Sequence, residues 1–195
     1  MKKLVTAIIL WSSVIIASAT ERSIPFNSLS DTTNTDFKKI MVCGNTIVYF
    51  VQARKDQVTI DEGDPATVSI KQEGHKLTIF SDQKTPAIVT VYFKNIYRID
   101  ASDKVTVRSA GKINLENLQV LLRNDAKARI KTNTQSLYTV VDDGAKLELL
   151  GTTVQHISKI EERATLDVKN FTAQIIRQNQ QDGIIARTAD EAFKP

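Results

Sequence analysis

The chain has 195 residues, with 26 lysines and arginines against 22 aspartates and glutamates, which gives a formal net charge of +4. Because the basic residues are dispersed and form no long stripe, the composition argues against a nucleic-acid-binding protein, which must neutralise several phosphates. The single cysteine, Cys43, excludes an internal disulfide. The length is sufficient for one domain with a substantial core.

Residues 1–19 have the pattern of a secretory signal peptide. Lys2 and Lys3 form a positive start, an apolar run follows, and residues 17–19 (ASA) supply the small side chains of a cleavage site. An uncleaved membrane anchor is the alternative, but it needs about 20 apolar residues, and this run is shorter and interrupted by serines. We predict cleavage, export and no stable membrane anchor afterwards. Cleavage removes both lysines, which leaves 24 basic against 22 acidic residues, a net charge of +2.

Residues 20–35 are rich in Ser, Thr, Asn and Asp and are predicted to be a flexible leader. From residue 36 onward the chain consists of short runs that alternate apolar and polar residues, such as "KLTIFSD" and "AIVTVYF". These runs contain many β-branched residues and are separated by Gly, Asp, Asn or Pro, which is typical of strands and turns. We predict one all-β domain over residues 36–176. Cys43 lies among strand formers and is predicted to be a buried, unreactive thiol instead of a reactive or intermolecular one.

A short pattern returns every nineteen residues in the second half of the chain. The unit small-x-apolar-x-apolar begins at Ala126, Ala145 and Ala164. The interval is kept by the middle apolar position of the unit, Ala128, Leu147 and Leu166, and by three further sets: Leu122, Val141 and Ile160; the polar residues Arg129, Glu148 and Asp167; and Thr132, Gly151 and Asn170, which we interpret as turns. Self-similarity of this kind is typical of stacked units that bury a shared core.

The interval predicts a parallel β-solenoid, in which each turn places the residues of one column above those of the previous turn. The alternative is an antiparallel β-sandwich built from hairpins, because Arg123-Asn124-Asp125 and Asp142-Asp143-Gly144 are acceptable hairpin connections. Hairpins need no fixed period, whereas a solenoid does. Upstream the phase slips, since Val105-x-Val107 lies two residues off the register of the repeat.

The segment "DFKKIMVCGNTIVYFVQARKDQVTIDEG" resembles the opening of a known family. It contains Phe37-x-x-Ile40-x-Val42-x-Gly44 followed by Val48-x-Phe50-x-Gln52. Together with "GHKLTIFSD", "AIVTVYF" and the repeat, it is similar to the family called putative auto-transporter adhesin, head GIN domain, over residues 36–173. The resemblance implies an exported bacterial protein, often from Bacteroidetes, with a right-handed β-helix-like fold and no established activity.

The chain departs from that family at its corners and at its C-terminus. Members usually carry Ser-Gly pairs at successive corners, whereas this chain has Asn124-Asp125, Asp142-Asp143-Gly144 and Glu161-Glu162. The usual glycine-rich finish is replaced by "IIRQNQQDGIIARTADEAFKP", so residues 177–195 are predicted to be a C-terminal cap or tail. The resemblance therefore implies a fold and assigns no functional residue.

The corner acids are the candidates for catalytic chemistry: Asp125, Asp142, Asp143, Glu161 and Glu162. Paired carboxylates act as general acid and base in polysaccharide hydrolysis, and the nineteen-residue register would bring Asp125, Asp143 and Glu162 to one edge. Asp and Asn also favour turns, because their side chains bond nearby backbone amides. No Arg, Lys or His recurs beside the acids in a catalytic arrangement. We therefore interpret them as turn residues, with weak cation binding as the next alternative.

No catalytic residue, metal ligand or cofactor is assigned from the sequence, and ligand-binding residues stay undetermined. His75 and His156 are far apart and lack the clustered neighbours that a zinc site needs. We predict an exported, non-enzymatic β-solenoid protein of the periplasm or cell surface, with an adhesive or scaffolding role and a surface glycan or protein as partner. The alternatives are a carbohydrate-binding module and, less favoured, a polysaccharide hydrolase or lyase that uses the corner acids. The oligomeric state stays open.

Overall fold

The computed structural model describes residues 36–180 and 184–186. This part of the chain is all-β and contains thirteen strands. It contains no helix that could span a membrane. The predicted signal peptide (1–19), the predicted leader (20–35) and residues 181–183 and 187–195 of the predicted C-terminal segment lie outside the described residues.

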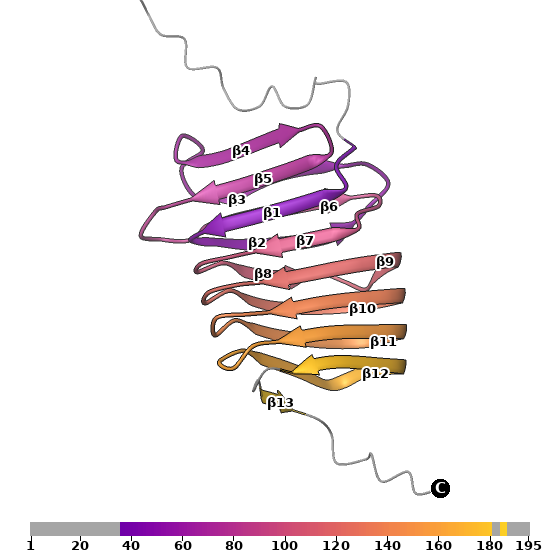
Figure 1. Cartoon of the computed structure of the whole chain (residues 1–195). Coiled ribbons are helices and arrows are strands. Elements are labelled where there is room, and N and C mark those ends of the chain that lie inside the picture. The colour runs from indigo at the N-terminus through magenta and orange to yellow at the C-terminus, as the bar shows by residue number, and fades with distance from the viewer. Residues whose placement is uncertain (1–35, 181–183, 187–195) are drawn as a thin grey trace, which may run out of the picture.

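The thirteen strands form one curled sheet whose two halves face each other (Figure 1). One layer contains β4 (Val68–Glu73), β5 (Lys76–Ser81), β1 (Lys39–Gly44), β7 (Arg98–Ala101) and β9 (Ile113–Leu122). The other layer contains β3 (Gln57–Glu62), β6 (Ala87–Phe93), β2 (Thr46–Gln52) and β8 (Thr106–Ser109).

Three long strands continue both layers toward the C-terminus. They are β10 (Lys127–Val141), β11 (Lys146–Ile160) and β12 (Thr165–Gln180). The first residues of β10 pair with β8, and the later ones pair with β9, so a single strand bends from one layer into the other. The short strand β13 (Ile184–Ala186) pairs with the start of β12.

The predicted columns are confirmed by the strand register. β10 and β11 pair in parallel with Ala128 opposite Leu147, and β11 and β12 pair in parallel with Leu147 opposite Leu166. Val141 lies between Leu122 and Ile160 in the same way. All of these side chains are buried, because side chains alternate between the two faces of a strand and these point into the space between the layers.

The polar set points to the outer face, as the alternation predicts. Arg129 lies opposite Glu148, which lies opposite Asp167. The Arg129 guanidinium and the Glu148 carboxylate form an ion pair of 3.4 Å at the surface. Exposed pairs of this kind contribute about 0–1 kcal/mol, so this ion pair adds little to the stability of the fold.

The upstream phase slip has a local cause. Val107 pairs with Ala128, 21 residues later, whereas Ile113 pairs with Thr132, 19 residues later. The connection between β8 and β9 is therefore two residues longer than the corresponding stretch inside β10. The extra residues lie where the chain passes from one layer to the other, and the stacking on either side is preserved.

The prediction that Thr132, Gly151 and Asn170 mark turns is wrong. They lie inside β10, β11 and β12, at the place where the long strands bend without leaving the sheet. Gly151 has a φ of 102°, and the pairing of β11 with β12 shifts between Glu148 and Leu150, so that Gly151 pairs with Phe171 and not with Asn170. A glycine in a strand marks such a bend as readily as it marks a turn.

Antiparallel pairing occurs at one end of the stack. β3 pairs with β6 and β4 pairs with β5 in antiparallel orientation, while the strands from β9 to β13 pair with their neighbours in parallel. The two antiparallel strands are the terminal strands of the sheet path. β3 and β4 are therefore edge strands at this end of the sheet.

The prediction that the Cys43 thiol is buried is only partly right, because Cys43 is half-buried. Its neighbour Val42 points into the core, and the two-residue period of β1 therefore directs Cys43 outward. Burial, reinforced by the charge of Asp103, raises the pKa of the Cys43 thiol. A raised pKa disfavours the nucleophilic thiolate, which agrees with the expected low reactivity.

Candidate functional site

The corner acids lie in tight turns between the long strands. Three equivalent backbone hydrogen bonds close these turns: Ala126 N to Arg123 O (3.2 Å), Ala145 N to Asp142 O (3.0 Å) and Ala164 N to Glu161 O (3.0 Å). Asn124 and Asp143 occupy equivalent positions with φ values of 56° and 55°. Asn and Asp tolerate this left-handed conformation better than other non-glycine residues, so turn geometry accounts for their presence.

The predicted acidic edge is only partly formed. Because Lys127 pairs with Lys146 and Val141 with Ile160, Asp143 follows Asn124 in the stack and precedes Glu162. Asp125 is displaced by one position and lies near Gly144. Asn124 Nδ2 donates a hydrogen bond to Asp103 Oδ1 (2.8 Å), which connects the series of turns to the turn that contains Asp103.

Asp142 is the corner acid with the most perturbed environment. Burial, followed by the nearby charges of Glu161 and Asp143, raises the pKa of its carboxyl, while Lys159 and Arg123 act in the opposite direction. Its Oδ1 atom is buried and has no hydrogen-bond partner. A raised pKa is typical of a general acid. However, no group of three His, Cys, Asp or Glu side chains in the described ranges is arranged to hold a metal ion.

The interior becomes polar toward the C-terminal end, which the sequence did not predict. Thr132, Thr134, Thr139, Thr153, His156 and Ser158 are all buried side chains between the layers. Thr134 Oγ1 donates to Thr153 Oγ1 (2.9 Å), and Thr132 Oγ1 donates to Ile113 O (3.0 Å). These bonds satisfy the hydroxyl groups of Thr132 and Thr134, which reduces the cost of burying them.

His156 stands at the centre of this polar interior. It is 3 % exposed, and its Nε2 lies 3.0 Å from Thr139 Oγ1. Its ring contacts the ring of Phe171 edge to face, with centroids 5.5 Å apart. Burial lowers the pKa of His156 to about 4, so the imidazole is neutral at physiological pH.

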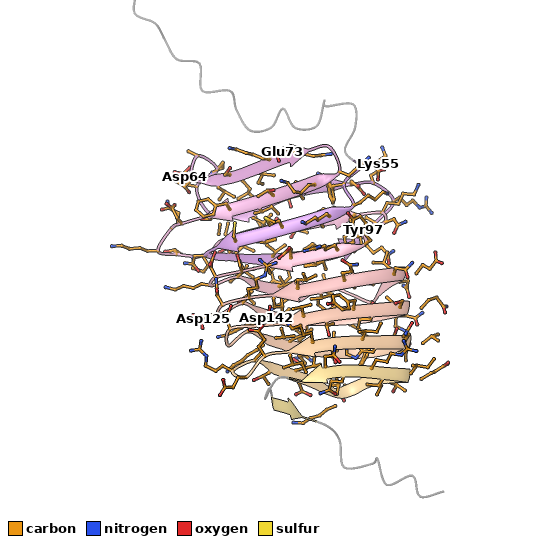
Figure 2. All side chains as sticks on the ribbon, viewed as in Figure 1. Lys55, Asp64, Glu73, Tyr97, Asp125 and Asp142 are labelled. Atoms are coloured by element: carbon orange, nitrogen blue, oxygen red, sulfur yellow. The ribbon has the colours of Figure 1, made fainter. Side chains whose placement is uncertain are left out.

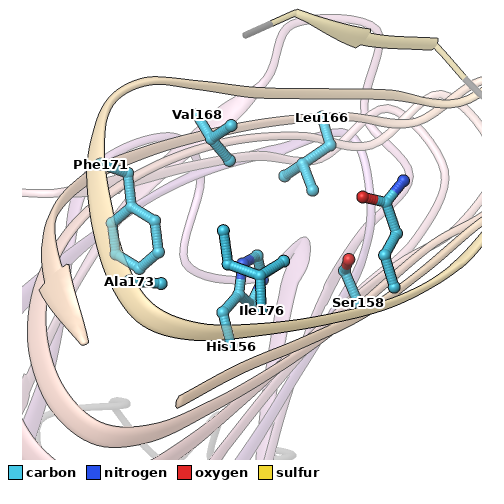
Figure 3. A pocket seen from close by; sticks show the side chains of 8 residues that line it. His156, Ser158, Leu166, Val168, Phe171, Ala173 and Ile176 are labelled. Atoms are coloured by element: carbon cyan, nitrogen blue, oxygen red, sulfur yellow. The ribbon is translucent and has the colours of Figure 1, made fainter. Parts of the chain in front are cut away.

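A small cavity lies beside His156 and is lined by residues of β11 and β12. It has a volume of about 40 Å³ and is lined by His156, Ser158, Leu166, Val168, Phe171, Ala173, Ile176 and Gln178. Figure 3 shows Leu166 and Val168 on one side of the cavity and His156 and Ile176 on the other. This volume accommodates roughly three water molecules, which is too little for a substrate.

We expect His156 to make stability depend on pH between about 4 and 6.5. In this window the unfolded chain binds a proton at His156 and the folded chain does not, so the free energy of unfolding falls as the pH is lowered. The full effect is about 3 kcal/mol for a shift of this size. Chemical denaturation at a series of pH values measures it.

The matched comparison uses His156→Gln, which keeps a polar side chain near Thr139 but does not titrate. Its stability should lose this part of the pH dependence, whereas His75→Gln, at an exposed histidine, should retain it. Equal pH profiles for the wild type and His156→Gln would show that His156 is not held neutral by burial.

An open groove of about 390 Å³ lies at the opposite side of the stack from the corner acids. Figure 2 shows Tyr97 at one side of the molecule and Asp125 and Asp142 at the other. Three segments line the groove: Gln52 at the end of β2, residues 94–97 between β6 and β7, and residues 114–117 at the start of β9. Its volume falls within the range of small-molecule sites.

The groove lining is rich in amide groups. Gln52, Asn95, Asn114 and Asn117 contribute four amide side chains, and Tyr97 is 49 % exposed. One cation, Lys94, and one carboxylate, Glu116, belong to the same lining. The groove therefore offers many hydrogen-bond donors and acceptors with little net charge.

Gln52 fixes the floor of the groove by joining its three segments. Its Oε1 accepts a bond from Asn114 N (2.8 Å), and its Nε2 donates to Asn114 O (2.8 Å) and Lys94 O (3.4 Å). Asp56 Oδ1 also accepts a bond from Lys94 N (2.6 Å). This groove is not predictable from the sequence, because its residues are separated along the chain and follow no motif.

These observations define an all-β protein with largely parallel strands, acidic turns along one side and an amide-lined groove on the other. The chain belongs to the family described as "Putative auto-transporter adhesin, head GIN domain", whose sequence model matches residues 36–180. The resemblance inferred from the sequence is thereby confirmed.

Two solved structures share the fold at low sequence identity. One is described as a "putative adhesin" from Parabacteroides merdae ATCC 43184, with 15 % identity, 78 % of this chain and 76 % of that chain covered, and a TM-score of 0.56. The other is described as a "Putative lipid binding protein" from Parabacteroides distasonis ATCC 8503, with 11 % identity, coverage of 78 % and 93 %, and a TM-score of 0.52. No curated protein matches the chain.

Proposed function

We propose that the chain is an exported, non-catalytic β-solenoid that binds a partner at the cell surface or in the periplasm, with an adhesive role. The solenoid form is supported by the parallel register of β10, β11 and β12 and by the constant interval between their columns. Export is supported by the signal-peptide pattern of residues 1–19. Membership of an adhesin-type family agrees with both.

The observation that carries the proposal is a groove with binding groups but without a catalytic pair. Its lining contains one carboxylate, Glu116, and no histidine or cysteine. Hydrolysis of a glycosidic bond normally requires two carboxyl groups on either side of the bond. Because the corner acids lie at the other side of the molecule, they supply no second carboxylate here (Figure 2). The groove is therefore suited to binding without turnover.

A hydrolase or lyase that uses the corner acids is the less favoured alternative. Asp142 has a raised pKa, which would suit a general acid. However, the turn geometry alone explains why Asn124 and Asp143 stand where they do and why the three backbone hydrogen bonds form, so no catalytic role is needed to explain them. A purely scaffolding role is also less favoured, since it gives no use to the exposed Tyr97 and its neighbouring amides.

The P. distasonis structure is described as a lipid-binding protein, but lipid binding has little support in this chain. The cavity beside His156 is apolar on one side, but its volume of about 40 Å³ is far below that of an acyl chain. A lipid would have to occupy a surface instead of an interior pocket.

The proposal predicts binding without catalysis. We expect the exported protein to release no product from bacterial or host polysaccharides. We also expect cells that lack the gene to lose attachment to surfaces, because the role is adhesive. Reducing-end assays and attachment counts measure the two outcomes, and fractionation of the cells locates the protein.

The control is a variant in which Asp125, Asp142, Asp143, Glu161 and Glu162 are replaced by Asn or Gln. These replacements keep the shape of the acids and remove their charge, so attachment should persist. Polysaccharide breakdown by the wild type that disappears in this variant would contradict the non-catalytic proposal. Unchanged attachment after deletion of the gene would contradict the adhesive role.

A further inference from the structure

The amide-lined groove has the chemistry expected of a site for neutral sugars. A sugar hydroxyl both donates and accepts hydrogen bonds, and an amide side chain offers both kinds of group. Asn95 and Asn117 are exposed in the groove, and within the described part of the chain their side chains form no hydrogen bond or ion pair. Their amides are therefore available to a ligand.

Tyr97 adds an apolar platform to these amides. Its side chain is 49 % exposed and lies in the same lining as Asn95 and Asn117. A tyrosine combines a flat apolar ring with a polar hydroxyl, so one face of a sugar ring can pack on it while the hydroxyl groups bond the amides. The adjacent Ile96 is 1 % exposed and anchors this segment in the core.

The groove is also ordered before any ligand binds. The amide of Gln52 is committed to Asn114 and Lys94, so it positions the two walls and is not itself free for a ligand. A site whose walls are already fixed loses less conformational entropy on binding. The single cation and single carboxylate of the lining, Lys94 and Glu116, give an acidic or basic ligand no net advantage.

We propose that this groove binds a short neutral segment of an oligosaccharide, with Tyr97 as the stacking surface and Asn95 and Asn117 as hydrogen-bonding groups. The inference rests on the proposed binding function and names the class of ligand. Gln52 is a positioning residue of this site. The site lies at the side of the molecule opposite the acidic turns (Figure 2).

The test is isothermal titration calorimetry of the exported form of the chain with four tetrasaccharides. Cellotetraose, mannotetraose and chitotetraose are the neutral probes, and tetragalacturonate is the acidic one. We expect at least one neutral probe to bind more tightly than tetragalacturonate. The variants Tyr97→Ala and Asn95→Ala/Asn117→Ala should each weaken that binding about tenfold or more.

The matched control is Tyr138→Ala, because Tyr138 is a second exposed tyrosine and does not line the groove. It should bind the neutral probe as the wild type does, and thermal melts should show that all variants stay folded. Binding that survives both groove variants overturns the assignment, as does tighter binding of tetragalacturonate or no binding of any neutral probe. If one of these results occurs and cells lacking the gene still lose attachment, the ligand class is wrong and the adhesive function stands.

Discussion

Replacing Gly151 with alanine is expected to destabilise the fold by about 3–5 kcal/mol, or to prevent folding. Gly151 has a φ of 102°, which an alanine adopts only with strain. In addition, a Cβ atom at this position would overlap the carbonyl oxygen of Thr132, the residue opposite it in β10. Neither backbone can move away easily, because each is held in the sheet on both sides. Urea denaturation of the purified variant measures the loss.

Gly111→Ala is the control for this prediction. Gly111 lies in the connection between β8 and β9, and a Cβ atom there would have no neighbour within 4 Å. We expect a change in the free energy of unfolding of less than about 1 kcal/mol. If Gly151→Ala is as stable as Gly111→Ala, β10 and β11 do not approach each other at Gly151 as described.

Replacing Leu147 with aspartate is expected to cost several kcal/mol, on the order of 4 or more. Leu147 is 1 % exposed and lies between Ala128 and Leu166 in the stacked core. A carboxylate there would have apolar neighbours in the rows on both sides, and the loss of its hydration would not be compensated. The midpoint of thermal or urea unfolding reports the effect.

The neighbouring variant Glu148→Lys tests whether the alternation is assigned correctly. Glu148 points outward between Arg129 and Asp167, so the substitution exchanges one surface pairing for another. We expect a change of less than about 1 kcal/mol. Similar losses of stability in Leu147→Asp and Glu148→Lys would mean that the two side chains do not face opposite sides of the sheet.

The repeat predicted the second half of the fold because stacking leaves a direct trace in sequence. Ala128, Leu147 and Leu166 occupy equivalent environments in successive rows, so the same kind of side chain is required at each. Gly151 was misinterpreted as a turn because its freedom at positive φ serves a bend inside a strand equally well.

The first half of the fold was less predictable. β1 lies between β5 and β7, so the row order in space differs from the order along the chain. β1 pairs with β5, where Leu77 lies, and with β7, where Arg98 lies, and no repeat in the sequence indicates these pairings. The runs that form β3 and β4 alternate like the others, and alternation alone does not distinguish antiparallel from parallel strands.

The groove and the surroundings of His156 could not be predicted from sequence patterns either, because they also depend on contacts between residues that are far apart along the chain. Gln52, Tyr97 and Asn117 line one groove only because the end of β2, the segment before β7 and the start of β9 come together at one side of the fold. His156 has no metal-ligating residue near it in the sequence, and its place in the polar interior depends on its contact with Thr139 of β10. The corner acids were recognisable in sequence, because turn residues are a local property.

The proposed solenoid is tested most directly by nuclear Overhauser contacts between backbone protons of β10, β11 and β12 in solution. Parallel rows predict contacts with a constant difference in residue number, which link Ala128 with Leu147 and Leu147 with Leu166. A hairpin through the turn at Asp142–Gly144 would instead place Leu147 opposite Thr139. The residue numbers of each contacting pair would then have a constant sum. Observation of the nineteen-residue contacts would support the stacked rows, and observation of the hairpin contacts would contradict them.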